Sequence, residues 1–219
     1  MPAPKPLHPA TGPPLPHVYW LGGGSGSAKS IVARRLARAH GLTLYDTDGA
    51  MADHGKRCDP AACPRLEAFK HMTMDERWLL RDPATMLATF HWFAGEGFDL
   101  ILEDLRALPP DPPLLVEGFR LLPALAAPAM ASPRHGLWLL PTPAFREKAF
   151  AARGTLWDIS NRTSHPPAAL DNLLQRDDLF TQRLRRETEA HGLAGLTVDG
   201  QRSEDELVRA VEAHFGLAG

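Results

Sequence analysis

A glycine-rich run near the start of the chain, residues 22–26, constrains the fold more than any other feature of the sequence. Residues 17–21 precede it and form a short β-branched and aromatic stretch, which is typical of a buried strand. Residues 30–40 follow it with an apolar stripe at helical spacing, and Gly41 supplies a C-terminal stop. A strand, a glycine turn and a helix in direct succession indicate one unit of a parallel α/β sheet.

The turn itself fits the phosphate-binding pattern G-x-x-x-x-G-K-[ST] at every fixed position but one, where Ala28 replaces the second glycine. Backbone N–H groups of such a loop wrap the β-phosphate of a nucleoside triphosphate, and the helix N-terminus adds positive potential. We expect Lys29 to bridge β- and γ-phosphate oxygens and Ser30 to place its hydroxyl on Mg²⁺. The predicted ATP-binding residues of the loop are Gly23, Gly24, Ser25, Gly26, Ser27, Ala28, Lys29 and Ser30.

Ala28 adds a methyl group where glycine is usual. The position borders the predicted helix, where right-handed dihedral angles suit alanine, so we expect a tolerated variant. A dinucleotide-binding G-x-G-x-x-G pattern is disfavoured, because Ser27 stands where that pattern needs glycine. A glycine turn that binds no ligand is the remaining alternative.

Short apolar runs alternate with helical patterns along the rest of the chain. Strands are predicted at residues 42–45, 114–118, 136–140 and 196–198. Helices are predicted at residues 74–80, 83–108, 143–153 and 203–215, and Gly95 and Gly97 are placed to break the second of them. The alternation predicts the three-layer P-loop NTPase fold, a five-stranded parallel sheet with helices on both faces and ligands at the strands' C-terminal ends.

Composition predicts a flexible Pro-rich tail at residues 1–17, which holds seven prolines, and one domain over residues 18–219. The 24 Lys and Arg residues nearly balance 26 Asp and Glu residues, so we expect neither nucleic acid nor a membrane as a partner. No apolar run approaches the ~20 residues that a membrane helix needs. Two cysteines, Cys58 and Cys63, fit a reducing compartment, which predicts a cytoplasmic protein. Monomer and homodimer both stay open.

Acidic residues follow two of the predicted strands. Asp46 and Asp48 come directly after residues 42–45 and share a parity, so they face the same side of an extended segment. Glu117 closes the apolar run at residues 114–116. Phosphoryl transfer needs a positioned acceptor hydroxyl and a metal that bridges phosphate oxygens, and these acids are candidates for both tasks. The alternative is that they only cap turns and helices.

At this point the chain resembles the P-loop nucleoside and small-metabolite kinases. Residues 23–30 look like the phosphate loop of uridine kinases, and Tyr45-Asp46-Thr47-Asp48 is similar to the Asp-Ser-Asp element of shikimate kinases. The resemblance implies that Asp46 lies by the magnesium ion and that Asp48 binds, or also deprotonates, the acceptor hydroxyl. Glu117 and Gly118 resemble the strand-end pair of uridine-kinase-like enzymes, which implies that Glu117 lies near metal or substrate. Shikimate kinases have a glycine run after this strand, so the motifs match no single family.

Arginines supply the candidate phosphate and anion contacts. Arg146, Arg153 and Arg162 flank residues 154–161, and kinases of this class carry a lid there, at about residues 153–166. Arg153 is the predicted catalytic lid arginine. Arg120 follows the Glu117-Gly118 corner, where we expect it to project from the strand end and to bind a substrate anion or phosphate. Because 19 of the 24 basic residues are arginine, a solvated surface position is the alternative for each of them.

Asp199 lies in the loop between the last predicted strand and the final helix, and in the kinases that this chain resembles that loop packs beside adenine. Two functions follow from these motifs. The first is an ATP- and Mg²⁺-dependent kinase that acts on a hydroxyl of a nucleoside or other small metabolite. The second is a regulatory or stress protein that binds a nucleotide without phosphorylating an acceptor, and Ala28 motivates it. The acceptor and the preference for ATP or GTP stay open.

Overall fold

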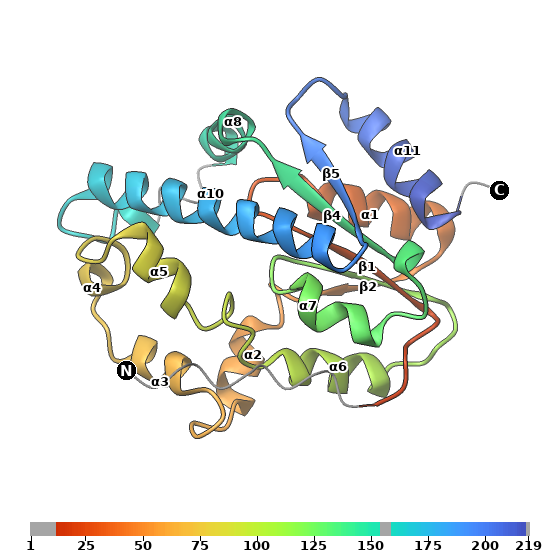
Figure 1. Ribbon diagram of the computed structural model, residues 1–219, viewed down its shortest axis with the longest axis horizontal. Coiled ribbons are helices and arrows are strands. Elements are labelled where there is room, and N and C mark those ends of the chain that lie inside the picture. Colours follow the sequence, from red (N-terminus) through yellow and green to blue (C-terminus); the bar gives the residue numbers. More distant parts are fainter. Residues whose placement is uncertain (1–11, 154–158, 218–219) are drawn as a thin grey trace.

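The computed structural model describes residues 12–153 and 159–217, and residues 1–11, 154–158 and 218–219 lie outside that description (Figure 1). Its centre is a sheet of five parallel strands in the order β2-β3-β1-β4-β5. The sheet and the helices around it confirm the predicted α/β fold class. The strands are β1 (Val18–Gly23), β2 (Thr43–Asp46), β3 (Leu114–Glu117), β4 (Gly136–Pro141) and β5 (Ala194–Val198).

The inner strands are buried on both faces. Successive side chains of a strand point to opposite faces, so Trp20 and Trp138 pack into the core on one face and Leu21 and Leu139 into the core on the other. All four side chains are at most 1% exposed. Such two-sided burial explains why these strands read as nearly continuous apolar runs.

Helices form a layer on each face of the sheet (Figure 1). One face is covered by α1 (Lys29–His40) and α11 (Glu204–Phe215), whose apolar residues share a core with β1 and β4. The other face is covered by α6 (Phe98–Ala107), α7 (Pro123–Ala126) and α10 (Pro166–Ala190). The chain also forms α8 (Pro143–Arg153) and the 3-10 helices η1 (Ala127–Ala129) and η2 (Pro133–His135).

Four short helices between β2 and β3 make up a region that we call the insert: α2 (Met51–Arg57), α3 (Pro64–Lys70), α4 (Met74–Trp78) and α5 (Pro83–Thr89). α4 and α5 pack against α10 through a core that contains Trp78, Met86 and Leu173. The insert thus follows the C-terminal end of β2 and is joined to the rest of the protein in part through α10.

The predicted helix at residues 83–108 is two helices. α5 ends at Thr89, Phe90 takes an extended conformation with ψ 115°, and α6 begins after Gly97, whose φ is 69°. The aromatic residues between the two helices leave the helical path and pack into the core, where Phe93 stacks on Phe180 with ring centroids 3.7 Å apart.

The helix α10 was not predicted from the sequence, nor were α2 and α3. Buried positions recur along α10 at helical spacing, but four of them are polar: Arg176, Asp177, Thr181 and Thr188. Polar residues on the buried side interrupt the apolar stripe by which an amphipathic helix is recognised. The buried side of α10 therefore combines apolar residues that pack into the core, such as Phe180 and Leu184, with buried polar ones.

The N-terminal tail is described only from Gly12 onward. Leu15 is 5% exposed, packs into the core under α6 and donates its N–H to Ala129 O over 2.8 Å. Flexibility stays a prediction for residues 1–11, which lie outside the described residues. Among the described helices, none combines the length and the apolar character that a membrane span requires.

Candidate functional site

The glycine loop connects β1 to α1 at the C-terminal end of the central strand. Gly24 N–H donates to Leu139 O of β4 over 3.1 Å, which anchors the start of the loop to the neighbouring strand. Gly23 has φ 139°, and a Cβ at this position would lie 2.1 Å from Leu139 O, so only glycine fits. Lys29 Nζ donates to Gly24 O over 3.0 Å and so lies across the loop.

Ala28 is the N-cap of α1 and has φ 65° and ψ 11°. The expectation of right-handed dihedral angles at Ala28 is therefore wrong. Among the described residues it is the one non-glycine residue with positive φ. A left-handed alanine brings its Cβ too close to the following carbonyl oxygen, at a cost of about 1 to 2 kcal/mol. The Ala28 carbonyl still accepts from the N–H groups of Ile31 and Val32, so the first turn of α1 forms in spite of that cost.

Two buried polar atoms beside the loop, Ser27 Oγ and Glu117 Oε2, have no hydrogen-bond partner among the described residues. Ser27 is 1% exposed and Glu117 is 2% exposed. Buried polar atoms are nearly always paired, and an exception calls for an explanation. A hydroxyl donor at a phosphate loop and a carboxylate acceptor at the next strand end fit a phosphate oxygen and a hydrated cation, respectively.

The strand register brings two predicted site acids together. Asp46 and Glu117 are paired positions of β2 and β3. The chain continues the ladder by one step, because Thr47 N–H donates to Glu117 O over 3.0 Å. Asp46 Oδ1 then accepts the N–H of Asp48 over 2.9 Å, which turns the chain so that Asp48 points back toward the sheet.

Asp48 is half-buried and is held by its neighbours. Its carboxylate accepts from the backbone N–H of Phe119, and Thr47 Oγ1 donates to Asp48 Oδ1 over 3.4 Å. Gly118 has φ 145°, and a Cβ there would lie 1.8 Å from Thr47 Oγ1 and 2.8 Å from Asp48 Oδ1. The Glu117-Gly118 corner thus allows the loop after β2 to close over the end of β3.

Charges couple these groups to the loop lysine. Burial raises the pKa of Asp48, and the nearby Asp46 raises it further, whereas the charge of Lys29 opposes both effects. Burial also raises the pKa of Glu117, against the lowering effects of Lys29 and of a hydrogen bond with Ser30. The three acids therefore lie within electrostatic reach of one another and of Lys29.

The set of ligands suits magnesium rather than a metal held by the protein alone. Across the described residues, no three His, Cys, Asp or Glu side chains are placed to hold a metal ion together. Mg²⁺ in nucleotide enzymes keeps several waters and binds one or two carboxylates together with the substrate phosphates. The Ser30 hydroxyl, the unpaired oxygen of Glu117 and the Asp46 carboxylate are of the kind that such an ion requires.

Arg120 lies elsewhere than its prediction assumed. It does not project from the strand end but is 2% exposed and donates to Thr47 O over 3.2 Å and to Gly97 O over 3.1 Å. Its guanidinium lies 4.0 Å from the Trp92 ring centroid and 2.9 Å from His54 Nδ1. Burial lowers the pKa of Arg120 to about 10. These contacts join the segment that carries Asp48 to the insert, and anion binding by Arg120 stays a prediction.

Beside Arg120 lies a partly buried polar network that the sequence did not reveal. The other ring nitrogen of His54, Nε2, is 2.8 Å from Asp104 Oδ2, and Tyr45 donates its hydroxyl to the same oxygen over 2.5 Å. Arg57 donates to Asp104 Oδ1 over 2.8 Å. The residues come from β2, α2 and α6, and no local pattern in the sequence connects them.

Arg146 on α8 contacts the glycine loop directly. It is 1% exposed, donates its Nε to Ser25 O over 3.3 Å and hydrogen-bonds to the hydroxyl of Thr181 on α10. Thr181 Oγ1 would lie 2.5 Å from a Cβ at Gly24. Arg146 also borders a cleft of about 330 Å³ between α8 and α10, which residues such as Asp171 and Asp178 line. α8 and α10 thus meet over the phosphate loop.

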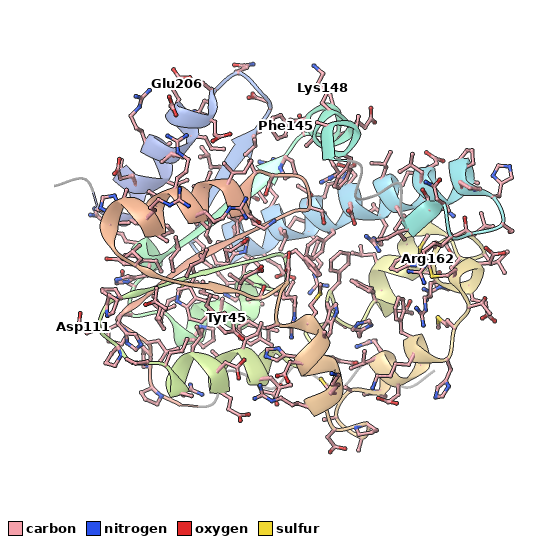
Figure 2. The ribbon with its side chains drawn as sticks, turned by 180° about the vertical axis from the view of Figure 1, so that it is seen from behind. Tyr45, Asp111, Phe145, Lys148, Arg162 and Glu206 are labelled. Carbon is pink, nitrogen blue, oxygen red and sulfur yellow. The ribbon has the colours of Figure 1, made fainter. Side chains whose placement is uncertain are left out.

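The other two arginines of the predicted lid are less informative. Arg153 is the last residue of α8, and its side chain lies outside the described part of the chain, as do residues 154–158 of the predicted lid. Arg162 is exposed and lies near the N-terminal end of α10, apart from Tyr45 at the sheet (Figure 2). A lid and a catalytic role for Arg153 stay predictions.

Asp199 is exposed and its carboxylate Oδ1 accepts the N–H of Gln201 over 3.0 Å, which shapes the turn between β5 and α11. A Cβ at Gly200 would lie 3.3 Å from the Phe145 ring, so this turn lies beside the start of α8 (Figure 2). Ser203 caps α11 with Glu206 in a capping box. The turn is therefore near α8, and adenine binding by it stays a prediction.

Comparison with known proteins does not assign this chain to a family. The sequence matches no family model, and no curated protein is significantly similar to it. Three solved structures are similar to this chain, each with a TM-score of 0.44: an uncharacterised protein of Eubacterium ventriosum, a gluconokinase of Sinorhizobium meliloti and a protein of Thermus thermophilus. In that order, their sequence identities to this chain are 13%, 19% and 20%. The matches cover 91%, 93% and 93% of this chain and 98%, 94% and 98% of the other chains. Similarity at this level carries no assignment of activity.

Proposed function

We propose that this chain is an ATP-dependent kinase that transfers the γ-phosphate to a hydroxyl group of a nucleoside or another small metabolite. The observation that carries the proposal is the buried, unpaired oxygen of Glu117, which lies among Lys29, Ser30 and Asp48 at the end of the phosphate loop. A loop that only formed a structural turn would gain nothing from a buried carboxylate with one oxygen left unpaired.

In this proposal each group has one task. The N–H groups of residues 23–30 bind the phosphates, and Lys29 leaves Gly24 O to contact the transferred phosphoryl group. Mg²⁺, when bound, would supply positive charge to the phosphate oxygens, and Ser30, Asp46 and Glu117 would hold it. Asp48 would orient the acceptor hydroxyl and take its proton, which its raised pKa favours.

A second function, nucleotide binding without phosphoryl transfer, is favoured by the strained Ala28. The left-handed alanine at the start of α1 lowers the stability of the folded protein, and it does so within the loop that would bind the phosphates. A regulatory protein needs only the phosphate-bound conformation, whereas a kinase also needs the acceptor acids. The half-buried Asp48 and the buried Glu117 make the kinase the better supported of the two.

Acceptor-dependent release of ADP tests the choice. The protein is incubated with ATP and Mg²⁺ and a broad panel of hydroxyl acceptors, while binding of ATP is measured by calorimetry. We expect at least one acceptor to raise ADP release well above the rate in buffer. Tight ATP binding with no acceptor-dependent turnover would instead support the regulatory function.

Lys29→Ala tests the site itself. We expect the substitution to abolish ATP binding or turnover while circular dichroism shows a folded protein. Wild-type affinity and turnover in this variant would refute the assignment of the loop.

The same proposal covers the partners and the location of the protein. It expects a small hydroxyl acceptor, no nucleic acid or membrane, and a cytoplasmic location. It leaves a monomer or a homodimer, which light scattering can distinguish.

A further inference from the structure

Arg176 on α10 is a buried arginine with an unused pair of donors. It is 7% exposed, and its Nε and Nη2 both donate to Asp177 Oδ1, over 2.9 and 2.6 Å. Its Nη1, which carries two further N–H groups, has no hydrogen-bond partner among the described residues. A guanidinium is permanently charged and presents its donors as a rigid fork that suits carboxylate and phosphate oxygens.

Aromatic rings surround this guanidinium. Its central carbon lies 5.2 Å from the Trp78 ring centroid, 5.3 Å from that of Phe90 and 5.1 Å from that of Phe93. The ring faces favour the cation but accept no conventional hydrogen bond from Nη1. The arginine is therefore fixed in position by Asp177 and by three rings, with its outer donors still unused.

A chain of contacts connects Arg176 with the glycine loop on one side and with Asp48 on the other. On one side, Thr181 donates its hydroxyl to Asp177 O over 2.9 Å, and a Cβ at Gly24 would lie 2.5 Å from that hydroxyl. On the other side, Phe93 packs edge-on to Phe119, with ring centroids 5.6 Å apart. The backbone N–H of Phe119 binds the Asp48 carboxylate.

Other arginines lie within electrostatic reach of Arg176. Burial lowers the pKa of Arg81 and of Arg146, and the charge of Arg176 lowers both further. Arg176 is paired with Asp177, and Asp178 lies 3.8 Å from Arg146 Nη1. All three guanidinium nitrogens of Arg81 donate hydrogen bonds, to Glu76 O, Thr89 Oγ1 and Arg77 O, whereas Nη1 of Arg176 has no such partner among the described residues.

We propose that Arg176 binds an oxyanion of the phosphate acceptor, so that the substrate is an anionic hydroxy compound with a carboxylate or phosphate group. The inference rests on the proposed kinase function. The hydroxyl of the acceptor would lie at Asp48 while its anionic group accepts from Arg176 Nη1. The aromatic rings would exclude water and strengthen that contact.

The test uses matched pairs of acceptors that differ only in the anionic group. Aldonates of three to six carbons are compared with the polyols of equal length, and nucleoside 5′-monophosphates with nucleosides, each with ATP and Mg²⁺. Wild-type protein is compared with Arg176→Met, and with Arg176→Met/Asp177→Asn, which keeps the local charge balanced should the single variant fold poorly. Arg77→Met is the control, because Arg77 also lies over a ring, that of Phe69, but donates to nearby carbonyls.

We expect ADP release with an anionic member of at least one pair, and a kcat/KM at least 10-fold lower for its neutral counterpart. Loss of the charged hydrogen bond should raise the KM for the anion by about 10- to 100-fold in both Arg176 variants. The affinity for a non-hydrolysable ATP analogue should stay within about 2-fold, and Arg77→Met should behave as wild type.

The remaining outcomes each decide something. Equal use of the neutral members, or an unchanged KM in both Arg176 variants, overturns the inference and leaves the kinase proposal standing. A loss of ATP-analogue affinity in these variants, measured without acceptor, means that Arg176 binds the nucleotide phosphates, which also overturns it. Tight ATP binding with no ADP release from any pair contradicts the kinase proposal and the inference together.

Discussion

Asp46 and Glu117 are paired residues at the C-terminal ends of two neighbouring parallel strands, β2 and β3. Because the ladder continues through Thr47 N–H to Glu117 O, the backbone fixes the separation of the two acids. Their side chains differ in environment, since Asp46 is exposed and Glu117 is 2% exposed. The pair therefore offers one solvated and one buried carboxylate beside the same phosphate loop.

Glu117→Gln should separate catalysis from stability. Since burial raises the pKa of Glu117, its ionised form is disfavoured in the folded protein, and the amide should not lower the free energy of unfolding. Loss of the charge should reduce Mg²⁺-dependent ADP formation by roughly 100-fold. Urea denaturation and steady-state kinetics measure the two effects. Glu189→Gln, at an exposed position of α10, is the control, and unchanged kinetics in Glu117→Gln would remove Glu117 from the site.

Ala28→Gly should stabilise the protein. Glycine accepts φ 65° without strain and so recovers about 1 to 2 kcal/mol, of which roughly 0.5 to 1 kcal/mol is offset by the greater freedom of glycine in the unfolded chain. We expect a net gain of about 0.5 to 1 kcal/mol in urea denaturation and an ATP affinity that is equal or higher. Ala33→Gly, inside α1, should instead lose about 1 kcal/mol or more. A lower free energy of unfolding in both variants would show that Ala28 is unstrained.

Arg120→Met distinguishes a structural role from the predicted anion contact. Removing the guanidinium leaves two carbonyl oxygens and His54 without their donor in a buried site, so the free energy of unfolding should fall by about 2 to 4 kcal/mol. Arg186→Met, at an exposed position of α10, should change it by less than about 0.5 kcal/mol. If Arg120→Met keeps wild-type stability and raises only the KM for the acceptor, Arg120 binds substrate as the sequence predicted.

His91 should make the fold sensitive to mild acid. It is 3% exposed, and burial, aided by the charges of Arg120, Arg77 and Lys70, lowers its pKa to about 3. Below pH 6.5 the unfolded chain takes up a proton that the folded protein does not. The free energy of unfolding therefore falls by about 1.4 kcal/mol for each unit by which the pH is lowered.

The difference between wild type and His91→Leu isolates that contribution. Urea denaturation at pH 7 and pH 5 should show the wild type losing about 2 kcal/mol more than the variant over this interval. Parallel losses in the two proteins would show that His91 titrates normally in the folded state.

The sheet and its glycine loop were predictable because local signals determine them. Apolar runs of strand length, the glycine turn and the stripe of α1 each lie within a short stretch of sequence, and the alternation of strands and helices then predicts a parallel sheet. The positions of Asp46 and Glu117 follow as well, because parallel strands bring their C-terminal ends to one edge.

Two features could not be predicted, for different physical reasons. The conformation of Ala28 belongs to the loop that Gly24 anchors to β4, whereas its place at the border of the predicted helix argued for right-handed dihedral angles. The role of α10 was hidden because Arg176 and Asp177 occupy buried positions where an amphipathic helix is expected to carry apolar residues. Polar residues in the stripe of a helix could have been recognised as a signal if the helix itself had been found.

Gly118 contributes no functional group to the site, and yet the closure of the loop after β2 depends on its missing side chain. Any replacement would push Thr47 and with it Asp48 out of place, at a residue that touches neither nucleotide nor acceptor in the proposed mechanism. In a family tree of such proteins, this position would be as invariant as a catalytic acid. At the end of β3, two adjacent residues would then be invariant for different reasons: Glu117 for its proposed chemistry and Gly118 for the backbone geometry that it allows.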